Sequence, residues 1–514
     1  MEAYFARRDS FRSRWLVLVV TVVLGMAFGM IRSGASWGSS AYDPASDPYS
    51  MQNITAGDGV QSWWGAGYTG QGVDVALIDT GVAPVSGLTG AGKIVNGPDL
   101  SFESQNPNLR YLDTNGHGTF MAGIIGGDDG QPGGYRGVAP GARILSVKVG
   151  AANGAVDVSQ VIAAIDWVVQ HRHDNGLNIR VINLSYGTIS QQPYVIDPLA
   201  YAVEQAWKAG IVVVAAAGNS GYQQGVSSGV TDPAYDPEII AVGASDTMGT
   251  PSSSDDQPAS FSAGALVCAL LACRAPNLLA PGAHLQGLRD PGSYIDQTNP
   301  SAALSDRYFR GSGTSEAAAF VSGAVALLLQ KYPDLTPDQV KRMLEQSTDH
   351  LPGFPLLWQG GGELDMRELL ADNPPRWAFQ LHFHSNGTDR LEASRGDNHL
   401  SMNGVVLQGE EDIFGKRFDS AAMAALEAAG SSWSGGTWNG SSWSGSSWSG
   451  SSWSGSSWSG SSWSNSSWSG NSWSGSSWSG SSWSGSSWSG SSWSGSSWSD
   501  SSWASGSWLG ASWG

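Results

Sequence analysis

Short apolar runs alternate with helix-like patterns along the chain from about residue 73 onward. Four of these runs are predicted to be strands: Val73–Ile78, Ile144–Val149, Val181–Ser185 and Ile211–Ala217. The last run is apolar almost throughout, which is typical of a strand buried on both faces. The alternation predicts an α/β fold with a doubly wound, mostly parallel sheet and helices on both faces. In such sheets the functional groups lie at the carboxyl ends of the strands.

Three helices are predicted from the same pattern. In residues 157–172 the apolar side chains fall on one helical face, and they follow Asp157, a residue type that is favoured as an N-cap. A second helix is predicted for residues 198–208, because a glycine follows it closely. A third begins at Thr336-Pro337, where a capping residue is followed by proline at the first helical position.

The charge of the chain excludes one class of function. The 514 residues include 26 basic and 44 acidic ones, which gives a formal net charge of −18. Residues 33–430 hold 21 of the basic and 41 of the acidic residues. Phosphate binding needs clustered Lys and Arg, so we expect no nucleic-acid partner. Two cysteines in the whole chain also exclude a disulfide scaffold and a multi-cysteine zinc module.

The first residues have the layout of an export signal. Residues 7–14 carry four Arg, and an apolar run from Trp15 to Ile31 follows them. This run is long for a signal core and short for a spanning helix, so residues 1–35 are either a cleaved signal peptide or a retained membrane anchor. In both cases the remainder lies outside the cytoplasm, because the Arg cluster stays inside. We therefore expect an extracellular or cell-envelope protein, secreted or anchored by residues 15–31, with residues 36–56 as a linker.

The C-terminal tail, residues 431–514, repeats Ser-Ser-Trp-Ser-Gly with few variations. It holds 17 of the 25 Trp residues, one at every fifth position from Trp433 to Trp513. A period of five suits neither a helix nor a strand, and we expect a disordered low-complexity segment. Three interpretations remain open: a flexible stalk, a module whose Trp rings contact the cell envelope or a membrane surface, and an ordered β-repeat.

Three segments carry residues of types that often take part in catalysis. Asp79 ends a predicted buried strand, His117 lies between two glycines at the start of a helix, and Ser315 lies in Gly-Ser-Gly-Thr-Ser before a long apolar helix. A serine hydroxyl is a weak nucleophile that needs an imidazole to take its proton and a carboxylate to fix that imidazole's tautomer. Each segment alone is typical of a turn or a helix cap, and only the combination indicates catalysis.

Together these segments resemble the subtilisin-like serine proteases, the subtilases, over about residues 57–350. The order Asp, His, Ser along the chain is the order found in subtilisin. The resemblance implies a catalytic domain at residues 57–370, with Asp79 as the orienting carboxylate, His117 as the general base and Ser315 as the nucleophile.

Further pieces of the sequence match the same family. Residues 216–219, Ala-Ala-Gly-Asn, resemble the segment that bears the oxyanion-hole asparagine, here Asn219. Residues 183–187, Asn-Leu-Ser-Tyr-Gly, resemble the strand edge that pairs with the substrate, which assigns Ser185, Tyr186 and Gly187 to substrate binding. The resemblance implies no cofactor for catalysis. It also implies structural calcium, for which the sequence shows no site.

One departure from the family lies beside the nucleophile. The family commonly has Met after the catalytic serine and a Pro-His pair a little further on, whereas this chain has Glu316, Ala319 and Phe320. A carboxylate beside an oxyanion hole opposes the developing charge unless it points away or is protonated. We therefore expect an exported serine endopeptidase that acts on polypeptides through an acyl-Ser315 intermediate. The alternative is a catalytically impaired subtilase fold that acts in cell-envelope adhesion or as a structural protein through its Trp-rich tail.

The segment from residue 371 to residue 430 is predicted to be a C-terminal extension. Within it, residues 377–384 alternate apolar and polar side chains, which predicts a half-buried strand. His382 and His384 share the polar face, but without a nearby acid or third ligand we expect a solvated strand face and no metal site. In residues 264–273 the two cysteines, Cys268 and Cys273, are either a disulfide or two buried apolar side chains.

Overall fold

The structure is a computed structural model. It describes residues 42–442 apart from 102, 105, 107, 132, 222–228, 265–273, 397, 403–404, 413–416, 433–436 and 439–440. The apolar segment 15–31, both cysteines and nearly all of the Trp-rich tail therefore lie outside the described residues. No helix in the described part of the chain is both long and apolar enough to cross a membrane.

The main sheet has the predicted α/β character. Among the described residues it contains ten strands, in the order β11-β12-β8-β6-β5-β4-β1-β3-β2, with β7 paired to β6. Neighbouring strands from β12 to β2 are parallel, and β11 and β7 join antiparallel. The strands are β1 (Asp74–Asp79), β2 (Ile94–Asp99), β3 (Arg143–Lys148), β4 (Ile179–Leu184), β5 (Val212–Ala216), β6 (Ile240–Asp246), β7 (Gln257–Pro258), β8 (Leu278–Pro281), β11 (Thr348–Asp349) and β12 (Glu363–Leu364).

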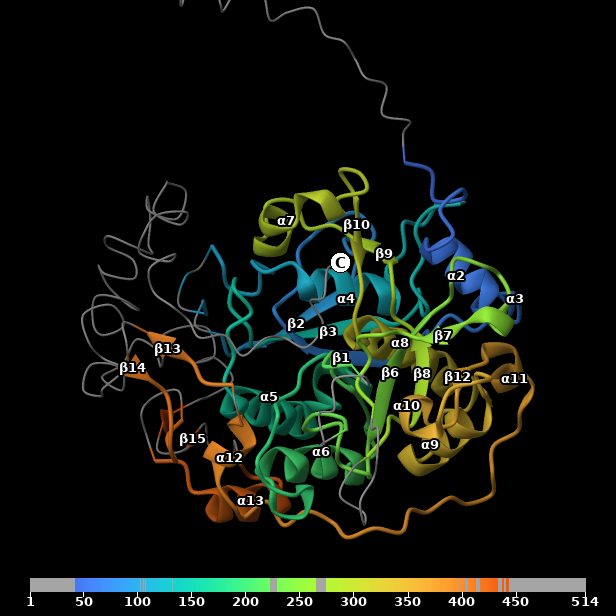
Figure 1. Ribbon diagram of the computed structural model, residues 1–514. Coiled ribbons are helices and arrows are strands. Elements are labelled where there is room, and N and C mark those ends of the chain that lie inside the picture. The colour runs from blue at the N-terminus through green and yellow to red at the C-terminus, as the bar shows by residue number, and fades with distance from the viewer. Residues whose placement is uncertain are drawn as a thin grey trace, which may run out of the picture. The chain divides into compact units, whose positions relative to one another are not determined.

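Helices cover both faces of this sheet. Helices α4 and α8 lie together on one side, and α5 and α6 lie together on the other (Figure 1). The described helices are α2 (Met51–Gly57), α3 (Val60–Gly65), α4 (His117–Gly126), α5 (Val158–His171), α6 (Pro198–Lys208), α7 (Tyr294–Thr298), α8 (Thr314–Lys331), α9 (Pro337–Gln346), α10 (Leu356–Gln359), α11 (Met366–Ala371), α12 (Leu391–Arg395) and α13 (Ser420–Ala428). The doubly wound fold expected from the sequence is confirmed.

Three small strand pairs lie outside the main sheet. They are β9 (Leu285–Leu288) with β10 (Tyr308–Gly311), β13 (Ser401–Met402) with β14 (Val405–Val406), and β15 (Thr437–Trp438) with β16 (Ser441–Ser442), all antiparallel. The last pair is the only regular structure that the described residues include from the Trp-rich tail.

Local sequence signals explain where the helices begin. The Asp157 carboxylate accepts the Ser159 amide at 3.0 Å, and the Gln160 side chain accepts the Asp157 amide at 2.7 Å, which forms a capping box at α5. Thr336 and Gln339 form the same arrangement at α9. Helix α8 is buried from Thr314 to Leu329, as expected of a helix that is apolar on every side.

Two expectations about the borders of the catalytic unit differ from the structure. Helix α2 starts within residues 36–56, the expected linker, and its Met51 and Ile54 are fully or almost fully buried. Residues 377–384 do not form a strand. Their apolar side chains point outward, since Leu381 is 88% exposed and Phe383 is 82% exposed, while the side chain of His382 is only 10% exposed. The predicted strand was therefore wrong, because buried carboxylates of the core bind the polar face.

Candidate active site

Asp79 and His117 meet at the carboxyl edge of the sheet. Asp79 is the last residue of β1 and His117 is the first residue of α4, and both are fully buried. His117 Nδ1 lies 2.9 Å from Asp79 Oδ1 and 3.0 Å from Oδ2. A carboxylate in this position favours the tautomer with hydrogen on Nδ1, which leaves Nε2 as the basic nitrogen.

A second carboxylate, Asp113, shapes the loop that presents His117. Its Oδ1 accepts hydrogen bonds from the Thr80 hydroxyl at 2.8 Å and from the Gly116 amide at 2.8 Å. Its Oδ2 accepts from both the amide and the hydroxyl of Thr119 at 2.7 Å. Asp113 therefore satisfies the amide groups around the first turn of α4. Asp113 is not among the residues singled out from the sequence, although an acid four residues before the histidine is a readable signal.

Glycine is required where α4 approaches the end of β1. A Cβ atom on Gly118 would lie 2.1 Å from the carbonyl oxygen of Gly81, and the Gly118 amide instead donates to the Thr80 hydroxyl at 2.9 Å. The close approach brings His117 against Asp79. This explains why a glycine follows the histidine.

The electrostatics of His117 are set by two opposing effects. Burial by itself lowers the pKa of the imidazole, while the charge of Asp79 and its hydrogen bond raise the pKa. The net pKa of His117 is raised above its usual value. The protonated imidazolium form is therefore stabilised. A general base needs this property, because it holds a proton during part of a reaction.

Ser315 lies in the first turn of α8, where helix amides and the positive end of the dipole favour negative charge. The Ser185 hydroxyl, just after β4, donates to the Ser315 carbonyl oxygen at 3.2 Å and accepts from the Asn183 side chain at 3.0 Å. The side chain of Ser185 therefore braces the turn that carries Ser315. Tyr186 and Gly187 follow it in buried positions, and the Tyr186 hydroxyl accepts from Asn398 of the C-terminal extension at 3.4 Å.

Asn219 is oriented by Thr314, a residue that the sequence motifs do not single out. The amide and the hydroxyl of Thr314 donate to Asn219 Oδ1 at 2.9 and 3.0 Å. The Thr314 hydroxyl also accepts from the Gly218 amide at 3.0 Å. Asn219 Nδ2 makes no hydrogen bond to any described residue. Thr314 thus holds the Asn219 amide group with its donor free, and its place directly before Ser315 was the signal for this role.

Glu316 is also fully buried, next to Ser315 on α8. Neither of its carboxylate oxygens makes a hydrogen bond to another described residue. Burial raises the pKa of Glu316 to about 8, even though the nearby charge of His117 lowers it. At neutral pH the carboxyl group is therefore protonated and carries no charge.

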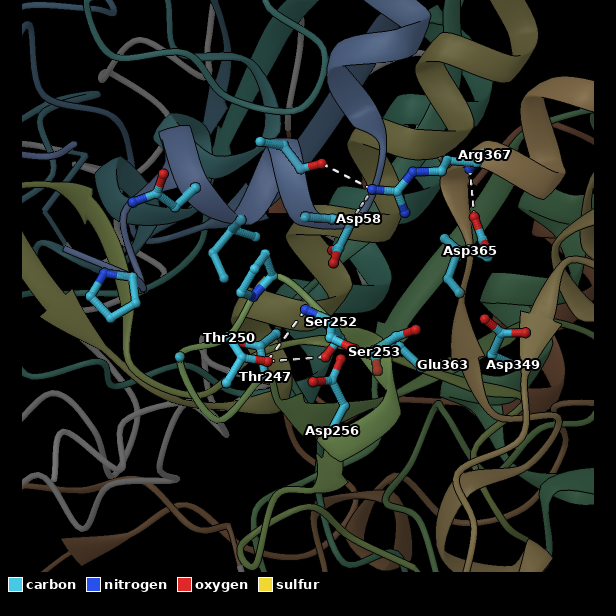
Figure 2. Close-up of a pocket in the computed structure, with 18 residues that line it drawn as sticks. Asp58, Thr247, Thr250, Ser252, Ser253, Asp256, Asp349, Glu363, Asp365 and Arg367 are labelled. Carbon is cyan, nitrogen blue, oxygen red and sulfur yellow. Dashed lines mark hydrogen bonds between the residues drawn. The ribbon is translucent and has the colours of Figure 1, made fainter. Parts of the chain in front are cut away.

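A separate cavity of about 350 Å³ is lined by five acidic side chains, and three of them, Asp58, Asp256 and Glu363, interact through their charges (Figure 2). None of Asp79, His117 and Ser315 lines it. The three carboxylates do not form a group whose ligand atoms all lie within 4.8 Å of one another, as oxygens around one calcium ion would. Burial raises the pKa of each. They therefore do not fit the calcium site expected from the family resemblance.

Comparison with known proteins agrees with this geometry. The subtilase family model matches residues 70–379. The chain belongs to the subtilase family. Serine protease AprX of Bacillus subtilis (strain 168) is 39% identical over 285 residues, which cover 55% of this chain and 62% of AprX. This chain therefore spans less than two thirds of the length of AprX. Subtilisin DY of Bacillus licheniformis is 37% identical over 305 residues, which cover 59% of this chain and 92% of subtilisin DY.

One solved structure is also similar to this chain. The crystal structure of a cold-adapted subtilisin-like serine proteinase shares 30% sequence identity, with a TM-score of 0.42, over 58% of this chain and 88% of that one. The family resemblance seen in the sequence motifs is confirmed. AprX is named as a serine protease, and the solved structure is named as a subtilisin-like serine proteinase.

Proposed function

We propose that this chain is an exported serine endopeptidase with Ser315 as nucleophile. The observation that carries the proposal is the contact of His117 Nδ1 with both oxygens of Asp79, at 2.9 and 3.0 Å, in a chain of the subtilase family. Such a contact fixes the imidazole and stabilises its protonated form, which is what a serine nucleophile needs from its base.

The proposed reaction has two halves. Ser315 Oγ attacks the carbonyl carbon of a peptide bond while His117 Nε2 takes the hydroxyl proton. The tetrahedral intermediate collapses as the carbon–nitrogen bond breaks, and the same proton passes from His117 to the departing amine. Water then attacks the acyl-Ser315 ester with His117 again as base, which releases the carboxylic acid and restores the serine hydroxyl.

The proposed oxyanion hole consists of Asn219 Nδ2 and the Ser315 amide. The free donor of Asn219 supports this role, since Thr314 holds the opposite side of that amide group. Donors that are oriented before the reaction stabilise the developing negative charge without reorganisation. The neutral state of Glu316 at pH 7 is compatible with that charge. The backbone of residues 185–187 is proposed to pair with the substrate, as the sequence analysis predicted.

Covalent labelling tests this proposal. The purified chain is incubated with a fluorophosphonate probe, and Ser315→Ala and the exposed-site control Ser254→Ala are treated in parallel. We expect one label per chain in the wild type and in Ser254→Ala, and none in Ser315→Ala. Labelling should accompany hydrolysis of an unfolded protein substrate. Equal labelling of Ser315→Ala would contradict the proposal, and absence of label in all three would favour the impaired-enzyme alternative.

Export and the role of the tail are separate proposals. The Arg-rich and apolar residues 7–31 support export, and the N-terminal sequence of protein recovered from the culture medium distinguishes a cleaved signal from a retained anchor. The repeated Trp residues support retention at the cell envelope. Deletion of residues 431–514 should move the protein from the envelope fraction to the medium, and an unchanged distribution would exclude this role.

A further inference from the structure

We infer that Glu238, His382 and His384 form a binding site for a divalent transition metal, with Zn²⁺ as the best fit. Among the described residues, they are the one group of three or more His, Cys, Asp or Glu side chains whose ligand atoms all lie within 4.8 Å of one another. Two imidazoles and a carboxylate are ligands that zinc prefers. From the sequence alone no metal is expected here, because no acid lies nearby in the chain, but the fold supplies Glu238 from a distant part of the chain.

One of the two distances between ligand atoms suits a single ion, and the other would lengthen when an ion binds. Zinc binds nitrogen and oxygen at about 2.0–2.2 Å, so two ligand atoms of a tetrahedral site lie about 3.4 Å apart. Glu238 Oε2 lies 2.6 Å from His382 Nε2 and 3.5 Å from His384 Nδ1, values on either side of that separation. The two imidazole rings are 5.2 Å apart between centroids, with an angle of 72° between their planes.

Two of the ligand atoms are buried against each other. Glu238 Oε2 and His382 Nε2 lie 2.6 Å apart as an ion pair, and neither atom has a further hydrogen-bond partner among the described residues. Glu238 is 6% exposed as a residue. Both atoms therefore have lone pairs that a cation could bind in place of the shared proton.

His382 is oriented as a metal ligand usually is. Its Nδ1 lies 3.1 Å from the backbone carbonyl oxygen of Phe383, which only a protonated Nδ1 can bind. The lone pair of the neutral ring is then on Nε2, the atom that faces Glu238. Metal-ligating histidines characteristically donate their other nitrogen to a carbonyl or a carboxylate.

Further carboxylate oxygens stand next to this group. Glu204 Oε2 lies 3.2 Å from His384 Nδ1, and it also pairs with Lys208 at 3.3 Å. Glu204 Oε1 accepts the Ser385 amide at 2.5 Å, which fixes the chain directly after His384. Glu204 thus strengthens the negative field around the two imidazoles, while Lys208 partly neutralises it.

The location indicates a structural role. Glu238 lies two residues before β6 and Asp79 is the last residue of β1, and because the strands between them are parallel the two residues lie at opposite edges of the sheet. The metal would fasten residues 382–384, near the start of the C-terminal extension, to the amino edge of the sheet. It would not contact substrate.

Metal binding by the full chain tests this inference. The protein, in a Ser315→Ala background to prevent self-digestion, is freed of metal by dialysis against a chelator and titrated with Zn²⁺. We expect one zinc per chain and a rise in melting temperature. In His382→Ala and in His384→Ala, zinc should bind more weakly by more than about 100-fold, because loss of a partner outside the ligand set alone costs about 10- to 100-fold.

Two controls keep the result decisive. His173→Ala removes an exposed histidine and should bind zinc as the parent does. Glu238→Gln removes the charged ligand with almost no change of shape, so it reports on the site even where a histidine variant misfolds. Zinc binding that is absent from the parent, or that is equal in the parent, Glu238→Gln and both histidine variants, would overturn the inference. In the active parent, brief chelation should leave the initial rate of peptide hydrolysis unchanged.

Discussion

At the scale of single residues, the buried polar groups of the site divide into those with partners and those without. Asp79 and Asp113 have their oxygens occupied by donors from the surrounding loops. Asn219 Nδ2 and the Glu316 carboxyl group have no hydrogen-bonding partner among other described residues. A free donor is useful where an oxyanion forms. A free buried carboxyl group is stable only while it stays protonated.

Glu316 should make the stability of the protein fall as the pH rises. Burial raises its folded-state pKa to about 8 from a usual value of 4.5. The folded state therefore binds a proton that the unfolded state releases, and the contribution present below pH 4.5 is lost progressively towards pH 8. We expect Glu316→Gln to gain unfolding free energy relative to wild type across this range, by at most about 1.4 kcal/mol per pH unit.

Denaturant unfolding between pH 4.5 and pH 8 checks this expectation, again in a Ser315→Ala background. Asp306→Asn, at an exposed aspartate just before β10, is the matched control and should follow the parent curve. If the curves of the parent and of Glu316→Gln were parallel, the carboxyl group would not be titrating as its burial implies.

Thr314 should matter for the rate of catalysis. Its hydroxyl bridges Asn219 and the Gly218 amide, so Thr314→Val keeps the shape of the side chain but releases one of two hydrogen bonds that orient Asn219. Full loss of an oxyanion donor costs about 10²- to 10³-fold in kcat, and loosening one costs less, about 10-fold. We expect kcat to fall and KM to stay nearly constant in steady-state peptide hydrolysis. Thr314→Ser should restore the rate, and an effect on KM alone would contradict the positioning role.

The sequence suggests the candidate site residues but not the residues that position them. Asp79, His117 and Ser315 are recognisable because they stand in family motifs at the ends of predicted elements. Thr314 and Asp113 act through hydrogen bonds to loops that only the folded chain brings together. Their roles depend on which atoms face each other, and this information is absent from residue type and spacing.

At the scale of elements, local signals determined most of the secondary structure. Helix α6 has the predicted bounds, and α5 begins one residue after its predicted cap. The segment 377–384 has an equally regular alternation, yet it is not a strand. Alternation states that two faces differ but not which one is buried, and here Glu204 and Glu238 bind the polar face. The acids come from segments more than 130 residues earlier in the sequence, so no local pattern contains them.

Helices α12 and α5 are joined by a buried ion pair. Arg395 Nε lies 2.6 Å from Asp157 Oδ2, and both side chains are fully buried. Asp157 also caps α5, so this contact ties the extension to the beginning of a core helix. Arg395→Met would leave the Asp157 charge buried without its cation, and we expect a loss of about 3–5 kcal/mol in unfolding free energy.

Unfolding in denaturant measures this loss. Arg390→Met replaces an exposed arginine just before the same helix and should change the stability by less than about 0.5 kcal/mol. Limited proteolysis should cleave the extension of Arg395→Met first, because α12 is the element released. Equal stability of the two variants would show that the ion pair does not hold the extension.

At the scale of the whole molecule, the family match ends at residue 379, but the tightly packed structure continues beyond it. Residues after this point supply partners to buried acids of the core. Ser394 donates to Asp197 at 2.9 Å, the Ser385 amide donates to Glu204 at 2.5 Å, and His382 pairs with Glu238 at 2.6 Å. The buried acidic side chains of the core therefore receive hydrogen bonds and ion pairs from a segment outside the residues that the family model matches.

Removal of the extension should therefore destabilise the catalytic unit in a pH-dependent way. In a fragment of residues 42–374, Glu204 loses the Ser385 amide and Glu238 loses the His382 imidazole, so the folded-state pKa of each carboxyl group rises. A raised carboxyl pKa contributes stability only at low pH, and that contribution is lost as the pH rises. We expect the fragment to melt at a lower temperature than residues 42–442, with a larger difference at pH 8 than at pH 5.

A fragment of residues 42–430, which keeps the extension and lacks the Trp-rich tail, is the matched control for this comparison. It should melt within a few degrees of residues 42–442 at both pH values, because it retains Ser385, Ser394 and Arg395. All three forms carry Ser315→Ala, so that self-digestion does not set the melting temperature. A difference that is equal at the two pH values, or smaller at pH 8, would mean that the extension stabilises the core by apolar packing rather than by binding its acidic side chains.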